Sequence, residues 1–505
     1  MTINLFKDIR ATIENRKKSI LFLLSLLAIL INFILMLTHE AWRDEAQAWL
    51  ISRDLSPLEM IKQMSYEGHP ILWYFILAPF SKLGFPYITT NIISFIIMSV
   101  CILLIVYKSP FDLFTKICII FSEMCIYHYA VVSRSYCLCA LFIILIAIHY
   151  AKRFEHPIYF GILLACLLQT HIIMAGMVFI IAVVHFIDVI YKYTHEKDCK
   201  KAKFLITNII GLVIVFLGGV LLLIELINVG NASDAGQLQI IADTNIIYTI
   251  KNCLSTLYEY GIIMFGLNVP LMVVLIVSSI VLLFTKRINK KIVIIGLFSI
   301  VWQLFIFQLW PVSTQRLITW QYILMWGLWV SYDADLMGQI IDRCFAKLKT
   351  NRKFTYAGII IIAFMIIMPF GELTEDYTQE YSDAKDTAKF IEQLPKEAVI
   401  YENTEDFCNA VIPYLKTKQI INPFSGKKAS YCDRNKNKAH SCNVDEFLDM
   451  CREKNPNKNE IYLLCSDESN SIENVEELLA NSLIVYRTIG FVQTEKYKVY
   501  KVNIR

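Results

Sequence analysis

The sequence predicts an all-α membrane domain that crosses the bilayer many times, followed by a small α/β domain. Three observations lead to this prediction. The 505 residues are 56% hydrophobic and only 18% charged, so the chain is more apolar than soluble globular proteins. Apolar runs of membrane-spanning length recur between residues 20 and 370. After Gly371, charged residues and asparagines become frequent, and short strand-like and helix-like stretches alternate.

The first apolar run, residues 20–37, is long enough to span a bilayer and too long for the core of a signal peptide. No small-residue cleavage site follows it, so we interpret it as a retained helix. Together with later runs, the sequence predicts about eleven spanning helices. The later runs lie at roughly 86–107, 111–131, 134–151, 156–171, 172–191, 203–228, 258–284, 291–309, 314–332 and 354–370.

The distribution of basic residues predicts how the chain crosses the membrane. Five lysines and arginines between Lys7 and Lys18 precede the first run, which places the N-terminus in the cytoplasm. The apolar run 69–83 is short and contains Pro79. If this run does not cross, every strongly basic connection falls on the cytoplasmic side, whereas all of them fall outside if it does. We therefore predict that 69–83 is a juxtamembrane or re-entrant helix.

With this orientation, the polar segments able to do chemistry collect on the extracytoplasmic face. They are the first external loop 39–69, the corners 133–136, 169–171 and 310–316, the loop 229–257, and everything after residue 370. We divide the chain into a transmembrane domain, residues 1–370, and an extracytoplasmic α/β domain, residues 371–505. The sequence thus predicts an integral membrane protein whose active site and C-terminal domain lie outside the cytoplasm.

The α/β prediction for the C-terminal domain depends on an alternation of short elements. Helices are expected at 383–394, 405–415 and 475–481, and strands at 399–402, 460–465, 483–487 and 496–502. Residues 425–442 are rich in Lys, Asn and Ser and are expected to form a mobile loop. Cys432 and Cys442 would either pair in an oxidising compartment or remain free thiols.

Asp44 and Glu45 follow the first predicted helix and lie between Trp42 and Trp49. Tryptophan is favoured at the membrane–water boundary, so both carboxylates are expected at headgroup depth. Partial desolvation favours a protonated carboxyl, so we expect the pKa of Asp44 to move up toward the working pH of a general base. Adjacent residues point in different directions, so Glu45 is expected to orient or bind a group, with a solvated side chain as the alternative.

Two arginines are predicted at the outer ends of spanning helices. Arg134 starts one helix, and Arg316 follows Trp310 and Pro311 at the start of another. A cation at a helix N-terminus opposes the helix dipole, so we expect both arginines to meet an anion. Snorkelling toward lipid headgroups is the alternative.

Two histidines on the same face each have two interpretations. His69 precedes Pro70, which suits a helix start, so His69 either binds a phosphate or carboxylate or caps the helix. His171 follows Thr170 at another outer corner. It is either a metal or substrate ligand or a core histidine with internal partners.

Four short motifs, in this order, resemble the C-type superfamily of integral-membrane glycosyltransferases. The resemblance is closest to the branch that includes protein O-mannosyltransferases and the lipid A aminoarabinose transferase. The motifs are the acidic pair Asp44-Glu45, Gly68-His69-Pro70-Ile71, Ser133-Arg134-Ser135-Tyr136-Cys137-Leu138 and Thr170-His171. The second motif lacks the second proline of Gly-His-Pro-Pro, and the third lacks the proline of Ala-Arg-Pro-Tyr-Ala-Leu. The match covers the first third of the chain, and the remainder matches in architecture.

The resemblance implies an extracytoplasmic active site and a polyprenyl-phosphate-linked sugar as donor. It implies that the catalytic acids are Asp44 and Glu45, with Asp44 as the base. A leaving lipid phosphate needs cationic partners rather than a strong general acid, and a single attack would invert the anomeric centre. The side chains expected at the donor phosphate are Arg134, Tyr136, Arg316 and His69.

Dependence on a divalent metal is an open question, because branches of the superfamily differ. The candidate ligands are Asp44, Glu45, His69 and His171, but their spacing does not require a metal. The cofactor, if there is one, is unknown.

The sequence leaves the sugar and the acceptor open, and the acceptor would be a lipid, a glycan or a protein. The net charge of +4, split among loops, gives no support for nucleic acid binding. The alternatives to a transferase are a transporter or flippase and a non-catalytic scaffold of cell-envelope glycan assembly. Many transporters contain repeated halves, and no repeat is visible in the sequence.

Overall fold

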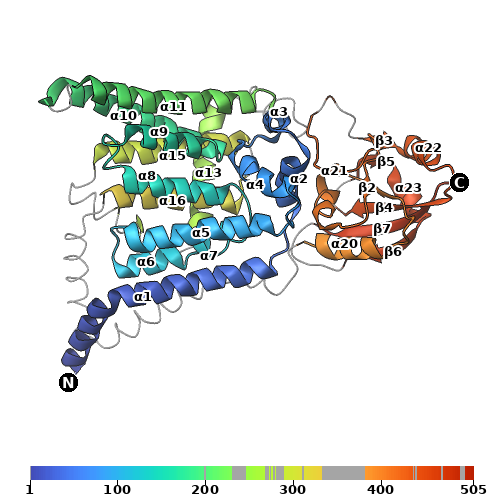
Figure 1. The fold of residues 1–505 in the computed structure, drawn as a ribbon, viewed down its shortest axis with the longest axis horizontal. Helices are drawn as coiled ribbons and strands as arrows, with labels where there is room; N and C mark the ends of the chain where they lie inside the picture. The colour runs from blue at the N-terminus through green and yellow to red at the C-terminus, as the bar shows by residue number, and fades with distance from the viewer. Residues whose placement is uncertain are drawn as a thin grey trace.

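The computed structural model describes residues 2–197, 201–229, 246–267, 289–309, 312–331 and 382–505, with short gaps at 436, 438–440, 468–469 and 489–494. Within 268–288 it describes Met272, Leu275, Ile276 and Ser279. A bundle of helices and a sheet-containing domain lie end to end, and short helices lie between them (Figure 1). The N-terminus lies at the far end of the bundle, and the C-terminus lies at the opposite end of the molecule (Figure 1).

Five helices in the described part are long and apolar enough to cross a membrane. They are α1 (Thr2–Thr38, apolar from Lys18), α5 (Thr89–Lys108), α10 (Ala175–His195, joined to the 3-10 turn η1, Ile172–Met174), α11 (Ala202–Leu226) and α15 (Lys290–Leu309). The helices predicted at 20–37, 86–107, 172–191, 203–228 and 291–309 are thereby confirmed. The chain has the architecture of an integral membrane protein, while the count of about eleven spans stays a prediction.

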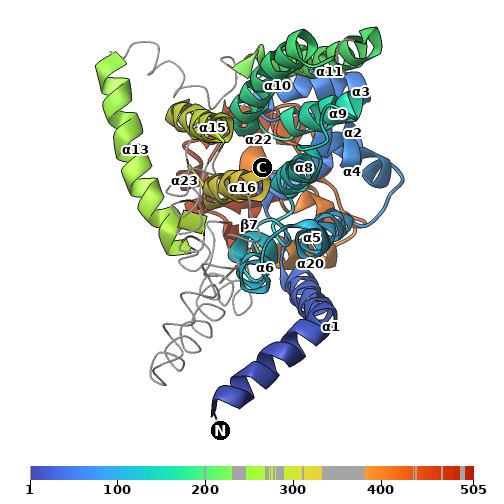
Figure 2. The ribbon, with the colours of Figure 1, turned by 90° about the vertical axis from the view of Figure 1, so that its left-hand side faces the viewer.

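Shorter or less apolar helices pack among these long ones. They are α8 (Tyr136–His149), α9 (Pro157–Leu168), α13 (Ile246–Leu267) and α16 (Thr314–Ser331). Seen along the bundle, α13 lies at its edge (Figure 2). It begins earlier than the helix predicted at 258–284. The helix predicted at 354–370 lies outside the described residues.

The stretch 111–131, predicted as one spanning helix, is broken. Two short helices, α6 (Leu113–Ile120) and α7 (Glu123–Ile126), are separated by Ser122, whose backbone is extended (φ −76°, ψ 155°). The Ser122 hydroxyl donates to the carbonyl of Ile119 at 2.6 Å, so a side chain competes with the backbone for helical hydrogen bonds. The prediction of a continuous helix here is wrong. The irregular backbone after α7 is buried in the bundle, as membrane depth would require.

Glycine allows close contacts between helices of the bundle. A Cβ atom at Gly161 of α9 would lie 2.3 Å from the carbonyl oxygen of Gly211 in α11. A Cβ at Gly176 of α10 would lie 2.3 Å from the Cβ of Trp302 in α15. Small residues at helix crossings are typical of membrane bundles, because there packing replaces the hydrophobic effect as the main source of association.

The loop after α1 folds into two helices, α2 (Arg43–Asp54) and α3 (Pro57–Glu67). Ser56 caps α3 by accepting a hydrogen bond from the N–H of the third helical residue. Gly68 ends α3 with a left-handed backbone (φ +69°), which glycine adopts without strain. These local signals determine where α3 stops and therefore where the next residue, His69, lies.

The short helix predicted at 69–83 is confirmed as α4 (Leu72–Lys82). It begins after Ile71, slightly later than predicted, so His69 lies in the connecting turn rather than at the N-cap. This turn joins α3 to α4 at the end of the bundle that faces the sheet domain (Figure 1).

Residues 382–505 form a five-stranded sheet with flanking helices, which confirms the predicted α/β character. The strand order is β2-β1-β4-β7-β6; β1 pairs parallel with β2 and β4, and β7 pairs antiparallel with β4 and β6. The strands are β1 (Ile400–Glu402), β2 (Ile420–Ile421), β4 (Glu460–Ser466), β6 (Leu483–Arg487) and β7 (Tyr497–Asn503). The other elements are α20 (Ala384–Gln393), α21 (Glu405–Cys408), η4 (Ile412–Tyr414), α22 (Val444–Lys454), α23 (Val475–Ala480), β3 (Cys442–Asn443) and β5 (Ile472–Glu473).

Two local predictions in this domain need correction. The helix predicted at 405–415 is interrupted, because Pro413 lacks the N–H that would continue an α-helix. The sequence reading also missed α22, which begins with a capping box formed by Asn443 and Glu446. That box was a usable signal, since the polar cap precedes an apolar position, Phe447, that is buried in the core.

The two parts of the chain share a hydrophobic core. Trp49 and Leu50 of α2 are buried together with Tyr87, which precedes α5, and with Ile391 and Val411 of the sheet domain. Because apolar contacts from both parts are needed to bury α2, the sheet domain helps to position the helix that carries the acidic pair.

The segment 429–435, expected to belong to a mobile loop, is docked on α2. The Gln47 side chain donates from Nε2 to the Cys432 carbonyl and accepts at Oε1 from the Cys432 N–H, both at 2.8 Å. Asn409 donates to the same Gln47 oxygen at 3.0 Å. The prediction of a mobile loop is therefore wrong for this segment, since its backbone is bonded to α2. Cys432 and Cys442 are free thiols, so the disulfide alternative is not realised.

Candidate active site

Six of the seven residues singled out from the sequence form one connected cluster, at the end of the bundle that faces the sheet domain. They come from five segments: α2, the turn before α4, the start of α8, the corner after α9 and the start of α16. The members are Asp44, His69, Arg134, Tyr136, His171 and Arg316.

Asp44 and Arg134 form the centre of the cluster. Arg134 Nη1 donates to Asp44 Oδ2 at 2.5 Å, and only 17% of the Arg134 side chain and 22% of the Asp44 side chain are exposed. The Nε of Arg43 lies 3.8 Å from the other Asp44 oxygen. The anion that Arg134 meets in this structure is therefore a carboxylate of the chain itself. The arginine turns inward, which the snorkelling alternative did not predict.

The environment lowers the pKa of Asp44. Burial by itself would raise the pKa, but the positive charges of Arg134 and Arg43 outweigh burial, and the pKa falls below its ordinary value. The prediction of a raised pKa is therefore wrong. It considered desolvation at the membrane interface and lacked the cations that the fold brings to the carboxylate. Asp44 is ionised at neutral pH and can accept a proton.

His69 is held as a neutral ring. Burial, followed by the charges of Arg134 and Arg316, lowers its pKa well below the ordinary value. Its Nε2 lies 3.3 Å from Nη2 of Arg134. A guanidinium only donates, so Nε2 must accept, and the proton of the neutral ring belongs on Nδ1. This buried Nδ1 has no hydrogen-bond partner among the described residues, so it offers an N–H to a ligand.

Tyr136 lies between His171 and Arg316. His171 Nδ1 accepts from the N–H of Ile173 at 3.2 Å, so its Nε2 carries the proton and lies 3.3 Å from the Tyr136 hydroxyl. Arg316 Nε donates to the same hydroxyl at 3.4 Å. The Tyr136 ring stacks between Tyr129 and His171. Because its oxygen accepts from both neighbours, the Tyr136 hydroxyl proton remains to be donated to a ligand.

Glu45 lies outside this cluster, although it follows Asp44 directly. The residue is fully buried, which excludes the solvated alternative. Its oxygens accept from His39 Nε2 at 3.1 Å, Asn91 Nδ2 at 3.3 Å, the Trp42 N–H at 3.1 Å and the Ser133 N–H at 2.7 Å. These partners join α2 to α5 and to the residue that directly precedes Arg134.

Three of the four candidate metal ligands, Asp44, His69 and His171, belong to the cluster, but Glu45 is turned away from it. Asp44 is bonded to an arginine, and Glu45 is turned toward Asn91 and Ser133. Within the described ranges, no group of three His, Cys, Asp or Glu side chains has the arrangement of a metal site.

Arg434 of the sheet domain, which was not predicted from the sequence, acts on the cluster through its charge. The charge of Arg434 acts on both Asp44 and His69. Arg434 lies 3.3 Å from Asp406 of α21 and 3.7 Å from Glu67 of α3, whose pKa is raised chiefly by burial. The only sequence signal was a position in a segment rich in Lys and Asn, which could not indicate an approach to Asp44.

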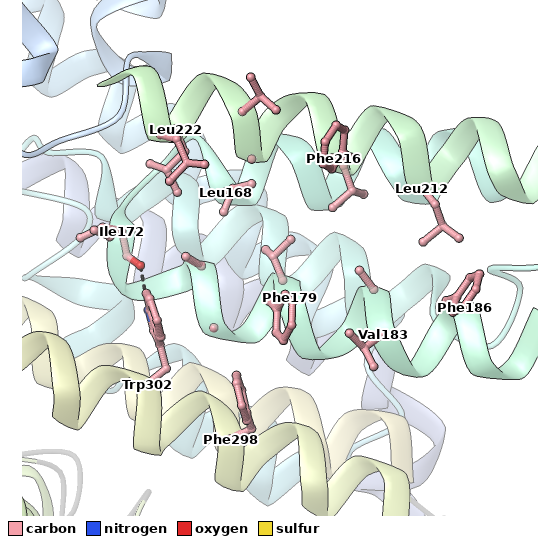
Figure 3. A pocket seen from close by; sticks show the side chains of 18 of the residues that line it. Leu168, Ile172, Phe179, Val183, Phe186, Leu212, Phe216, Leu222, Phe298 and Trp302 are labelled. Atoms are coloured by element: carbon pink, nitrogen blue, oxygen red, sulfur yellow. Dashed lines mark hydrogen bonds between the residues drawn. The ribbon is translucent and has the colours of Figure 1, made fainter. Parts of the chain in front are cut away.

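An apolar cavity of about 810 Å³ runs between α10, α11 and α15 (Figure 3). Its lining is almost entirely aliphatic and aromatic, and includes Phe179, Phe186, Phe216 and Phe298. At one end the lining residues are Leu168, Ile172, Leu222 and Trp302, where Trp302 Nε1 donates to the Ile172 carbonyl at 3.1 Å (Figure 3). Leu168 and Ile172 flank, in the sequence, the corner that carries His171, while none of the six cluster residues is among the residues that line the cavity.

Comparison with known proteins gives a fold. No family model matches the chain, and no curated protein sequence matches it. Among solved structures, the chain has the fold of ArnT. The similar structures are of ArnT from Cupriavidus metallidurans. One is bound to undecaprenyl phosphate, with 11% identity, a TM-score of 0.50 and coverage of 95% of this chain and 97% of that chain. The other is the apo state, with 10% identity, a TM-score of 0.51 and coverage of 96% and 98%.

The fold expected from the sequence motifs is therefore confirmed over nearly the whole chain, including the C-terminal domain. At 10–11% identity the likeness shows the fold alone. One fold can host many functions, so the function depends on the chemistry of the cluster.

Proposed function

We propose that the chain is a membrane glycosyltransferase that moves a sugar from a polyprenyl-phosphate carrier to an acceptor outside the cytoplasm. One observation carries the proposal: the carboxylate of Asp44 is paired with Arg134 in a cluster that also holds Arg316, the neutral His69 ring and the Tyr136 hydroxyl. The undecaprenyl phosphate bound to the similarly folded ArnT supports the choice of carrier.

The donor would be held by two different environments. Its polyprenyl chain would lie in the apolar cavity, where burial of hydrocarbon is favourable. Its phosphate would lie at the polar end, near Arg134, Arg316, Tyr136 and His69. Guanidinium groups match phosphate oxygens in charge and geometry. The Nδ1–H of His69 and the hydroxyl of Tyr136 would add neutral, directed hydrogen bonds.

Asp44 would act as the general base. Its carboxylate takes the proton of an acceptor hydroxyl while that oxygen attacks the anomeric carbon. The bond between this carbon and the phosphate oxygen breaks, and the electron pair leaves with the lipid phosphate. One displacement inverts the anomeric centre. After it, the proton is on Asp44, the sugar is on the acceptor oxygen, and the electron pair of the broken bond is on the lipid phosphate.

Arg134 would link the base to the leaving group. Its Nη1 donates a hydrogen bond to Asp44, and its Nη2 donates to His69 in the free site. As negative charge develops on the leaving phosphate, Arg134 shifts its hydrogen bonds toward it. The interaction of Asp44 with the positive charge of Arg134 then weakens. The pKa of Asp44 rises, so Asp44 becomes a stronger base at the step in which it takes the proton.

Glu45 would be a positioning residue. Its carboxylate joins α2 to the Ser133 N–H, so it fixes the Asp44 and Arg134 backbones relative to each other. Such support holds reacting groups near their productive geometry. We further propose the predicted sidedness, with the N-terminus in the cytoplasm and the site and residues 371–505 outside it. The acceptor would be a lipid, a glycan or a protein.

The test uses the purified full-length chain in lipid nanodiscs and a panel of polyprenyl-phosphate sugars, with membranes as the acceptor source. Release of polyprenyl phosphate is measured, because this product does not depend on the identity of the acceptor. Native chain, Asp44→Asn and the matched control Asp54→Asn, on the same helix, are compared with and without a chelator. We expect release by the native chain and the control, and loss in Asp44→Asn. Release from none of the donors by folded native chain would contradict the proposal.

A further inference from the structure

A buried carboxyl lies just outside the cluster, near the end of α11. Glu225 is fully buried, and its Oε1 accepts from the N–H of Ile71 at 3.3 Å. Its Oε2 has no hydrogen-bond partner among the described residues. An ionisable group in a spanning helix is costly and usually serves a function. Nothing local in the sequence indicates the partner of Glu225, which lies 154 residues away.

The first turn of α4 lacks a cap of its own. The first N–H groups of a helix have no partner within the helix, and the N-cap residue Ile71 provides no side-chain hydrogen bond. The preceding residue, Pro70, has no N–H and a fixed φ. The N–H of Ile71 is bonded to Glu225, and the N–H of Leu72 is bonded to the carbonyl of Gln169 at 3.3 Å. The helix is therefore capped by groups from elsewhere in the bundle.

We propose that Glu225 is a positioning residue that acts through His69. By holding Ile71, it fixes the turn that runs from Gly68 through Pro70, and so fixes the His69 ring against Arg134. That ring lies 3.3 Å from an Arg134 nitrogen, and its centroid lies 5.0 Å from the His171 ring centroid. The inference rests on the proposed function, because it assigns Glu225 to the support of the phosphate end of the donor site.

The same helix end also forms a wall of the apolar cavity. Leu222 and Leu226, on either side of Glu225, line it. The second cap, Gln169, lies beside the lining residue Leu168, and its side chain donates to the Gly218 carbonyl of α11 at 3.0 Å. The end of α11 thus supports two parts of the proposed donor site. One is the cavity wall that would hold the lipid chain, and the other is the turn that would meet its phosphate. A carboxyl that bridges them sets the distance between the two halves of the ligand site.

The test compares Glu225→Ala, Glu225→Gln and the control Asn228→Ala in full-length chain in phosphatidylcholine nanodiscs. Asn228 bonds Ser65 at 3.0 Å from the same end of α11 but does not touch Ile71. Two quantities are measured: amide hydrogen exchange in residues 69–75, and binding of undecaprenyl phosphate against undecaprenol, which lacks the phosphate. The first reports the cap directly, and the second reports its effect on the phosphate site.

We expect Glu225→Ala to speed exchange at Ile71 and to weaken undecaprenyl phosphate binding, each up to about tenfold, the effect of losing one buried hydrogen bond. Undecaprenol binding should not change. Glu225→Gln, which keeps an acceptor oxygen, should stay near the native values, as should Asn228→Ala. Unchanged exchange at Ile71 in Glu225→Ala, or equal loss of both lipids, would overturn the inference. Faster exchange with no binding of undecaprenyl phosphate by the native chain would instead confirm the cap and contradict the proposed function.

Discussion

Asp44 and Glu45 are neighbours in the chain but lie in opposite surroundings. The Asp44 carboxylate remains partly exposed among arginines, and its partners come from the groups that would face a substrate. The Glu45 carboxylate is sealed in the interior and accepts from two backbone N–H groups and two side chains. Two acids that are neighbours in the chain can therefore occupy different environments, one open at the cluster and the other sealed among hydrogen-bond donors.

The largest expected effect is on catalysis and comes from the open acid. Asp44→Asn keeps an oxygen that accepts from Arg134 but removes the basic group, so kcat should fall on the order of 10³-fold. The thermal unfolding temperature should change little. Steady-state release of polyprenyl phosphate and a thermal unfolding curve in detergent measure the two quantities. A variant within a few-fold of native kcat would remove the distinction between the two acids.

The sealed acid should show the reverse pattern. Glu45→Ala leaves buried donors without an acceptor, including the Ser133 N–H, and should destabilise the chain by about 3 kcal/mol. Glu45→Gln, which still accepts at one oxygen, should cost roughly half as much. Thermal unfolding compares both variants with the native chain. If Glu45→Ala unfolds at the native temperature yet has lost transfer, Glu45 belongs with the reacting groups instead.

A smaller effect is expected at the phosphate end of the open site. Tyr136→Phe keeps the ring stacked on Tyr129 and His171 and removes only the hydroxyl. Affinity for undecaprenyl phosphate should fall about tenfold, as for one hydrogen bond to a charged group, while affinity for undecaprenol stays constant. Binding isotherms in nanodiscs measure both. Equal weakening for both lipids would place the hydroxyl in packing rather than in phosphate binding.

The smallest expected effect is the pH dependence. The pKa of Asp44 in the folded chain lies below its value in the unfolded chain. The ion pair of Asp44 therefore stabilises the folded chain above about pH 4, and this stabilisation is lost as the pH falls through the pKa of the folded chain. His69 stays neutral because its pKa is lowered. The plot of kcat/KM against pH should therefore show no acidic limb from either group between about pH 5 and 7. A limb in that range that disappears in Asp44→Asn would show that the pKa of Asp44 is raised.

Much of the fold could be predicted from the sequence, because local patterns of apolar and polar residues determine its helices and strands. The apolar runs specify α1, α5, α10, α11 and α15, and the basic connections give a consistent orientation. The alternation of short elements after residue 382 predicts the sheet domain. The break at Ser122 was missed, because a hydroxyl that bonds its own backbone leaves the apolar pattern unchanged.

The members of the site could be predicted better than its chemistry. Asp44, His69, Arg134, Tyr136, His171 and Arg316 were all chosen from the sequence and lie together. The direction of the Asp44 pKa was predicted wrongly, because it depends on Arg134, 90 residues away. Arg434 was missed for the same reason, since its partners are brought near only by the tertiary fold.

The most direct test of the account measures a single turnover in which bound donor is mixed with acceptor. Native chain, Asp44→Asn and Glu45→Gln are each saturated with the donor that the native chain uses, at equal concentrations of folded protein. For Asp44→Asn we expect native donor affinity and a transfer step slower by about 10³-fold. For folded Glu45→Gln we expect a transfer step within about tenfold of native. Native transfer by Asp44→Asn, or a larger loss in Glu45→Gln than in Asp44→Asn, would contradict the assignment of Asp44 as the base.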